Sequence, residues 1–186
     1  MVEIAIAAGC SVFGIDLNKN LNPLGNDLGA TAVIRTNVMN PAQSFTNNKG
    51  FDAVFICADT KSNDPVDLAG MIARDKGVVV AVGAVGLEIP RKVYYEKELS
   101  FLISRSYGPG RYDNLYEEAG QDYPFGYVRW TEGRNLEAVI ELMENGKLNM
   151  SSLISHRFSI NEGIKAYEII TGKTKDDFLG VILQYP

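Results

Sequence analysis

The fold of this chain is decided by the stretch Phe51–Gly86, which reads FDAVFICADTKSNDPVDLAGMIARDKGVVVAVGAVG. Its first part, Phe51–Ala58, is a nearly continuous apolar run, which is typical of a strand covered on both faces. Asp64 and Pro65 mark the start of a helix, because aspartate caps helices and proline fits the first helical position. The sequence therefore predicts a buried strand followed by a helix capped by Asp64.

The rest of that stretch completes a strand–helix–strand unit. Apolar residues at helical spacing predict a buried stripe on the helix, made of Val66, Ala69, Ile72 and Ala73. Gly77 is predicted to end the helix, and Val78–Val82 to form a second covered strand. The two strands should be parallel, with a right-handed crossover. Because ligands bind beyond the carboxyl ends of such strands, the candidate binding segments are Ala58-Asp59-Thr60 and Gly83-Ala84-Val85.

Strands and helices alternate along the rest of the chain. We expect further strands over 11–15, 31–34 and 99–104, with helices or helical turns between them. This alternation predicts an α/β fold with an open, mostly parallel sheet and helices on both faces. The last segment reads strand–helix–strand with a capping box at Ser159 and Glu162. We therefore divide the chain into a domain over 1–149 and a tail over 150–186.

Composition limits the class of protein. The chain has 186 residues, 46% of them hydrophobic, and a net charge of −5, which argues against nucleic-acid binding. No apolar run is long enough to span a bilayer. Its cysteines, Cys10 and Cys57, and its one histidine, His156, are too few for a His/Cys zinc site. We expect Cys57 to be a reduced, buried thiol and the protein to be cytoplasmic.

Asp16 is the first candidate ligand-binding residue. An acid at the end of the second strand of a nucleotide fold accepts hydrogen bonds from both ribose hydroxyls and repels a 2′-phosphate, so it favours NAD over NADP. The alternative is a solvated aspartate that helps to start a turn. Gly83-Ala84-Val85-Gly86 would let a flat ring approach the backbone, or would be a plain glycine turn.

Other signals leave alternatives open. Arg105 follows a predicted strand and would hold a phosphate or carboxylate, or form a surface ion pair. His156 fits a structural or exposed role better than that of a general base. The aromatic segment 106–130 would wall a substrate pocket, contact a partner, or pack on the domain itself. No G-x-G-x-x-G loop is present, which weakens a dinucleotide site and a methyltransferase site equally.

These residues resemble the cofactor domain of the medium-chain, zinc-alcohol-dehydrogenase-like reductases. The resemblance is carried by AAGCSVFGIDLN (7–18) and by Phe51–Gly86. The segment SRSYGPGRYDNLYEEAGQDYPFGYVRWTEGRN (104–135) resembles a bacterial branch in which the reductase is fused to a Gfo/Idh/MocA-type domain. LISHRFSINEGIKAYEIITGK (153–173) and GVILQYP (180–186) resemble the tail that returns to the family's catalytic domain.

The resemblance implies an NAD(P)-dependent oxidoreductase acting on an alcohol, aldehyde or sugar carbon. Its cofactor residues would be Asp16, Leu17, Ala58, Asp59, Thr60, Gly83, Ala84, Val85, Ser104, Arg105 and Ser106. The family's catalytic domain, with its zinc ligands, has no counterpart here, so no catalytic residue and no zinc are assigned to this chain. We expect an inactive fragment that keeps the dinucleotide scaffold, or a non-catalytic nucleotide-binding or self-association module.

The family's first strand, which lies between the second and fourth, is also without a counterpart. Backbone groups on the two facing edges then need other partners. Either the second and fourth strands pair directly, or another chain covers them, or this edge is dynamic. We expect NAD binding to be weak, and the exposed edges of the tail to favour a homo-oligomer or docking of a catalytic half.

Overall fold

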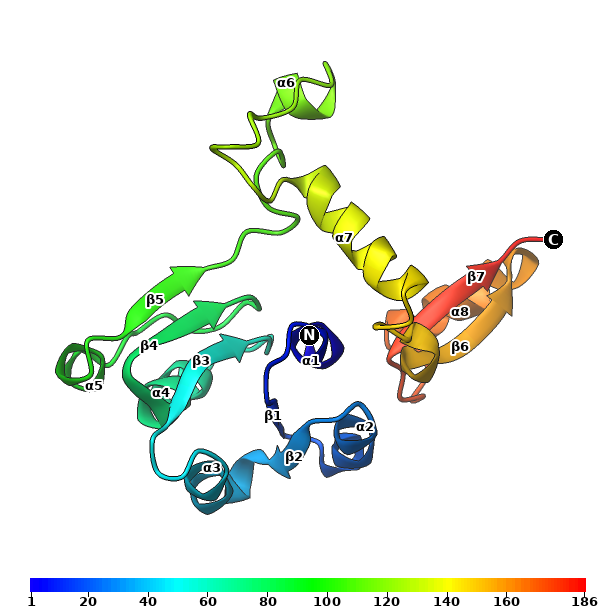
Figure 1. Cartoon of the computed structure of the whole chain (residues 1–186). Helices are drawn as coiled ribbons and strands as arrows, with labels where there is room; N and C mark the ends of the chain where they lie inside the picture. The colour runs from blue at the N-terminus through cyan, green and yellow to red at the C-terminus, as the bar shows by residue number, and fades with distance from the viewer.

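All strand pairs are parallel, but the strands are divided among three sheets (Figure 1). The computed structural model describes residues 1–186. In chain order the elements are α1 (Val2–Ala7), β1 (Phe13–Asp16), α2 (Asn22–Asp27), β2 (Thr31–Ile34), α3 (Met39–Phe45), β3 (Phe51–Ile56), α4 (Asp64–Ile72), β4 (Ala73–Ala81), α5 (Arg91–Glu96), β5 (Ser100–Ile103), α6 (Asn114–Glu117), α7 (Glu132–Glu144), β6 (Ile154–Ser159), α8 (Gly163–Ile170) and β7 (Gly180–Gln184). The sheets are β1–β2, β3–β4–β5 and β6–β7.

The predicted α/β fold with parallel strands and covering helices is confirmed. The sheet is interrupted between β1 and β3, which belong to different sheets. Direct pairing of these two strands, one of the three expected alternatives, is therefore wrong. Their facing edges have no strand partner.

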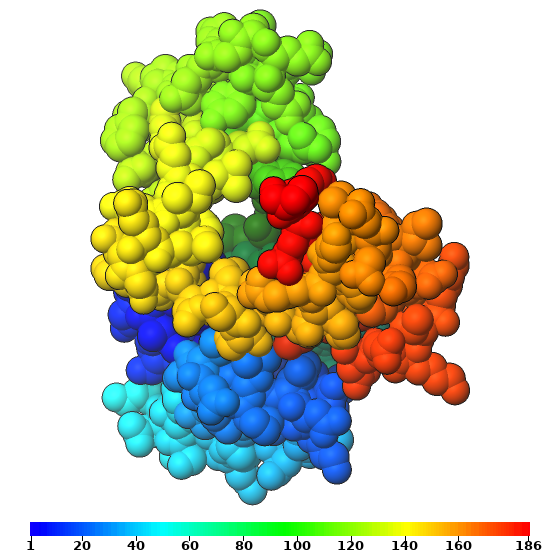
Figure 2. Space-filling model, turned by 90° about the vertical axis from the view of Figure 1, so that its right-hand side faces the viewer, coloured from blue at the N-terminus to red at the C-terminus, as the bar shows by residue number.

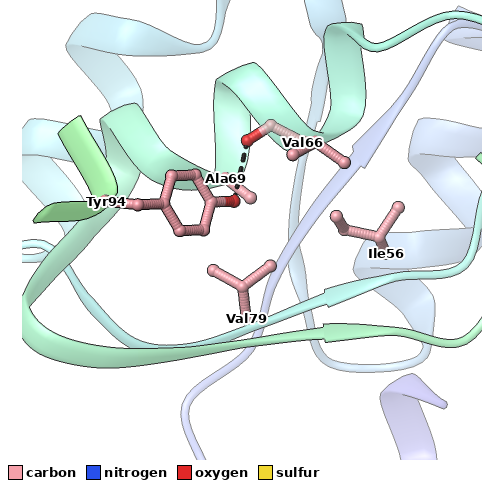
Figure 3. Packing of buried hydrophobic residues seen from close by; sticks show 5 residues of the cluster. All are labelled: Ile56, Val66, Ala69, Val79 and Tyr94. Atoms are coloured by element: carbon pink, nitrogen blue, oxygen red, sulfur yellow. Dashed lines mark hydrogen bonds between the residues drawn. The ribbon is translucent and has the colours of Figure 1, made fainter. Parts of the chain in front are cut away.

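One core cluster lies between α4 and the three-stranded sheet (Figure 3). Its buried members are Ile56, Val66, Ala69, Val79 and Tyr94. Val66 and Val79 are completely inaccessible to solvent. The Tyr94 hydroxyl reaches back over the cluster and donates a hydrogen bond of 2.9 Å to the Val66 carbonyl. The predicted stripe of α4 is thus buried, and a side chain from α5 fixes it in place.

A second cluster packs on a neighbouring face of the same helix. Leu68 and Ile72 of α4 meet Val38 and Ala42, and partly buried side chains of β1, β2 and β3 pack around them. Three aromatic rings extend this contact, since Phe13, Phe45 and Phe51 have centroids 5.3–5.8 Å apart. Helix α4 therefore packs against both sheets of the first 105 residues.

The predicted end of this helix is wrong. It stops at Ile72 rather than at Gly77, and the chain is already extended at Ala73. The reason is a distant side chain, because the Lys97 ammonium group donates hydrogen bonds of 2.8–2.9 Å to the carbonyls of Gly70, Met71 and Ala73. These bonds satisfy carbonyls that the last turn of a helix leaves free.

Three further expectations about this unit are wrong. Asp64 does not cap α4; its carboxylate binds Arg35, with Nε–Oδ2 and Nη2–Oδ1 distances of 2.9 and 2.5 Å. The first strand is not covered on both faces, because Phe55 is 48% exposed. Cys57 lies just beyond β3 and is exposed rather than buried, as is Cys10.

Helix α7 connects two outlying parts of the molecule (Figure 1). The segment that carries α6 stands at one end of it, and the unit β6–α8–β7 lies beyond the other. Leu136, Ile140 and Met143 form the apolar side of α7 and are exposed. Figure 2 shows a hollow between α7, in yellow, and the C-terminal residues, in red.

We predict that Tyr94→Phe lowers the free energy of unfolding by about 1 kcal/mol at neutral pH, because the buried hydrogen bond from its hydroxyl to the Val66 carbonyl is lost. Urea unfolding measures this change. The matched control is Tyr95→Phe, whose ring is exposed and makes no such bond. An equal loss of unfolding free energy in both variants would contradict a stabilising role for the Tyr94–Val66 hydrogen bond.

The same hydroxyl predicts a pH dependence. Burial, reinforced by the charge of Asp67, raises the pKa of Tyr94 from 10.0 to about 12. Between these values the unfolded chain has lost the proton that the folded chain retains, so stability falls as pH rises, by up to about 1.4 kcal/mol per pH unit from this group. The free energy of unfolding, measured at several pH values between 10 and 12, should therefore fall more steeply with pH for the wild type than for Tyr94→Phe.

Candidate functional site

Three of the predicted segments meet at the carboxyl edge of β3–β4–β5. The amides of Val82 and Gly83 both donate to the Ile56 carbonyl at 2.9 Å, and Thr60 donates to Ala84 at 2.8 Å. The Ser104 amide donates to Ala81, also at 2.8 Å. The segments 58–60, 83–85 and 104–106 are therefore joined by backbone hydrogen bonds into one surface, although they are distant in sequence.

Gly83 has a packing role in addition to the expected approach of a flat ring. A Cβ there would lie 2.0 Å from the Ala58 carbonyl oxygen. The glycine is required because the chain beyond β3 passes directly against it. Its first function is thus to hold the two strand ends together.

Asp16 lies at the end of β1, opposite Ile34 of β2 in the parallel register. Its carboxylate is exposed and accepts the Asn18 amide at 2.7 Å. Leu17 beside it is 79% exposed. Arg35 follows Ile34 and binds Asp64 at the start of α4, so the ends of β2 and β3 are tied to one edge of the molecule. The structure shows no contact between Asp16 and the other three segments.

The aromatic segment forms a lobe of its own. Tyr116 and Tyr123 stack with centroids 5.7 Å apart, and the Tyr116 hydroxyl bonds Thr131 and accepts the Gly133 amide. Tyr127 and Trp130 are exposed. Of the three alternatives for this segment, burial on the domain surface is wrong; the lobe is fixed to the start of α7 and leaves most of its rings open to solvent.

A hollow of about 510 Å³ lies where this lobe meets the end of β5. Its lining comes from both parts: Ser104, Arg105, Gly108, Pro109, Gly110, Arg111, Tyr112, Asp113 and Tyr123. Sequence reasoning selected Ser104 and Arg105 but not Arg111 or Asp113. The available signal was the Arg-Tyr pair that directly follows Gly108-Pro109-Gly110.

Hydrogen bonds within the hollow set its electrostatics. The Tyr123 hydroxyl donates to Asp113, and this bond lowers the pKa of the Asp113 carboxyl while raising that of Tyr123. Arg111 donates to Glu117 at 2.7 Å, which raises the pKa of its guanidinium group. The charge of Arg105 opposes this rise in the pKa of Tyr123 without reversing it. At neutral pH the Asp113 carboxyl is thus ionised, and the Tyr123 hydroxyl and the Arg111 guanidinium group are protonated.

His156 stacks on Phe158, and its Nδ1 lies 2.9 Å from the Ser155 hydroxyl, far along the chain from the surface described above. No three His, Cys, Asp or Glu side chains come together in a way that could hold a metal ion. None of the helices is both long and apolar enough to cross a membrane.

The fold is that of a Rossmann-like α/β protein. Its parallel strands are joined by crossover helices, an acid lies at the end of β1, and the carboxyl ends of β3, β4 and β5 are joined by hydrogen bonds. The family model of the zinc-binding dehydrogenases matches residues 1–121. The chain therefore belongs to the zinc-binding dehydrogenase family.

Several known proteins are similar to this chain in sequence or in fold. D-xylulose reductase of Saccharomyces cerevisiae is 26% identical over 183 residues, which cover 89% of this chain and 44% of the reductase. Alcohol dehydrogenase TADH from Thermus sp. ATN1 has a similar structure, with a TM-score of 0.74, 22% identity, and coverage of 100% of this chain and 47% of that one. L-idonate 5-dehydrogenase from Escherichia coli gives a TM-score of 0.68, 22% identity, and coverage of 98% and 45%. This chain thus spans less than half the length of these proteins.

We predict that Gly83→Ala destabilises the fold by about 1–3 kcal/mol, because the new methyl group would displace the Ala58 carbonyl. Thermal or urea unfolding measures the loss. Gly126→Ala is the control, since a Cβ at Gly126 meets nothing within 4 Å. If the two variants were equally stable, the close approach of the two strand ends would not be a constraint.

Proposed function

We propose that this chain provides the dinucleotide-binding part of an NAD(P)-dependent oxidoreductase that acts on an alcohol or sugar carbon. The observation that carries this proposal is the joined surface of the segments 58–60, 83–85 and 104–106 at the carboxyl edge of parallel strands. The names of the relatives, a reductase of a sugar and dehydrogenases of alcohols, support the same reaction class.

Asp16 is proposed to accept the hydroxyl groups of the adenosine ribose. Only one of its carboxylate oxygens is used within the chain, by the Asn18 amide. Arg35, which directly follows the paired strand β2, is held by two hydrogen bonds to Asp64 and forms no ion pair with Asp16. A free acid of this kind repels a 2′-phosphate, which supports NAD rather than NADP. Leu17 beside it would border the adenosine.

The remaining roles follow the order of the strands. Ala58, Asp59 and Thr60 would border the cofactor, Gly83, Ala84 and Val85 would lie near the nicotinamide, and Ser104, Arg105 and Ser106 would lie near the nicotinamide or substrate. The chain has no G-x-G-x-x-G loop to hold the pyrophosphate. We therefore propose that NAD binds weakly and that turnover needs a catalytic domain supplied by another polypeptide segment. We also propose that the chain belongs to the bacterial branch in which the reductase is fused to a second oxidoreductase domain. Residues 150–186 would dock on the catalytic domain.

Calorimetric titration of the full chain tests this function. We expect saturable binding of NAD, weaker binding of NADP, and about tenfold or greater loss of NAD affinity in Asp16→Ala, because hydrogen bonds to a charged group contribute about 1.5–3 kcal/mol. Asp27→Ala, which removes an exposed carboxylate from α2, should bind like the wild type. Failure of NAD to bind at millimolar concentration, or unchanged affinity in Asp16→Ala, would contradict the proposal.

A second candidate function, self-association, is favoured by the exposed face of α8. Ile164 is 79% exposed, and Tyr167 and Ile170 on the same helix are also open to solvent. We propose that a second copy of the chain covers this face, because apolar side chains grouped on one helix are stabilised when removed from water.

Sedimentation velocity tests this association. The wild type should form a dimer in the micromolar range, and Ile164→Glu should sediment as a monomer. Lys165→Glu, which changes charge at the adjacent position, is the control for electrostatic effects. A monomeric wild type would contradict self-association without affecting the proposal of NAD binding.

A further inference from the structure

We propose that the hollow between the end of β5 and the aromatic lobe binds the carboxylate of a polyhydroxylated acid, and that Arg105 is the residue that holds it. The substrate class would then be hydroxy acids of the sugar-acid type. This inference rests on the proposed function, because it assigns the hollow to the substrate of that same dehydrogenase.

Arg105 is a charged group without a partner in the chain. Its guanidinium group makes no ion pair within 4.0 Å and donates no hydrogen bond, while the other arginine of the hollow, Arg111, is bound to Glu117. The carbon of the Arg105 guanidinium group lies 4.8 Å from the centre of the Tyr112 ring, and that of Arg111 lies 4.6 Å from the same centre. Stacking on this ring orients the Arg105 guanidinium group while leaving its donors available.

The four charged side chains around the hollow, two arginines and two carboxylates, carry no net charge, so a ligand anion is favoured only locally, beside Arg105, which has no ion-pair partner. Arg111 is balanced by Glu117, and Asp113 adds a full negative charge with a lowered pKa. The remaining positive charge is that of Arg105. A planar carboxylate matches the guanidinium fork with two hydrogen bonds, whereas a phosphate dianion would be repelled by Asp113. The Ser104 side chain and the Tyr112 and Tyr123 rings would face the hydroxyl-bearing carbons.

The backbone around the hollow is held in an unusual shape. Tyr107 and Tyr112 have φ values of 63° and 65°, which are rare for residues with a side chain. Gly110, with φ 110°, lies so close to Tyr116 that a Cβ would be 2.7 Å from the ring. Asn135 of α7 donates to the Tyr107 carbonyl at 2.7 Å. Backbone in such conformations persists only where its surroundings hold it, and it is concentrated at ligand sites.

The hollow also lies in the right place for a substrate. Its first lining residue is Ser104, whose amide is bonded to Ala81, two residues before Gly83. A ligand held by Arg105 would therefore be next to the segments proposed to approach the nicotinamide. The carboxylate would orient the ligand, and its carbon chain would extend towards the ends of β4 and β5.

The test uses amide NMR spectra of the full chain, titrated with D-gluconate and with D-glucitol, which has a hydroxymethyl group in place of the carboxylate. Gluconate should shift the amides of Arg105, Arg111 and Tyr112 and bind at least about tenfold more tightly than glucitol. Glucose 6-phosphate should bind more weakly than gluconate. Equal binding of gluconate and glucitol, no shifts at these amides, or tighter binding of the phosphate would overturn the proposal.

Arg105→Gln should lower gluconate affinity at least about tenfold, and Arg105→Lys should restore part of it. Arg129→Gln is the matched control, because Arg129 also stacks on two rings, Phe125 and Trp130, but does not line the hollow. Equal losses in Arg105→Gln and Arg129→Gln would overturn the proposal.

A further titration in the presence of NAD separates this inference from the proposed function. Displacement of gluconate by NAD would assign Arg105 to the cofactor and overturn the inference. Gluconate binding in a chain that does not bind NAD would leave the carboxylate site standing while the proposed function fails.

Discussion

Helix α4 is the constraint on which the rest of the structure depends. One face of it, with Val66 and Ala69, packs on the three-stranded sheet, and another, with Leu68 and Ile72, packs on α3 and the strands around it. The two sheets share no strand pair. Their relative position is therefore determined by side-chain packing on a single nine-residue helix and by the Arg35–Asp64 ion pair at its start.

This arrangement brings the strand ends together without a continuous sheet. Arg35 directly follows the end of β2, and Asp64 lies at the start of α4, beyond the loop that follows β3, so their ion pair links the carboxyl ends of the two sheets. Asp16 reaches that edge only through its register with Ile34. The candidate site thus has two parts. The first consists of the segments beyond β3, β4 and β5, which are joined by backbone hydrogen bonds. The second block is Asp16 at the end of β1, which is positioned by side-chain packing. We infer that the second block is the less rigid one, because no backbone bond joins it to the first.

Features that depend on the local sequence pattern could be predicted from the sequence, whereas features that depend on contacts between distant residues could not. The bounds of β2 follow from residue type and spacing, as does the buried stripe of α4 over Val66, Ala69 and Ile72, although Ala73, the last predicted member, belongs to β4. The end of α4 depends on Lys97, which lies more than twenty residues away and leaves no local signal at Gly77. The pairing of Arg111 with Glu117 and of Asp113 with Tyr123 likewise arises only when the aromatic segment folds on itself. The exposure of Cys57 could not be predicted either. An apolar run indicates a strand, but it does not show which of its residues other parts of the chain will cover.

The separation of β1 from β3 has a packing origin. Parallel strands pair only when they approach to about 4.8 Å. The β1–β2 pair is held beside α4 by the contacts of Val38 and Ala42 with Leu68 and Ile72 and by the Arg35–Asp64 ion pair. The unpaired backbone groups of each strand edge can hydrogen-bond with water at little net cost, because folding exchanges one set of hydrogen bonds for another. Packing on α4 thus accounts for the position of the β1–β2 pair without any backbone ladder between β1 and β3.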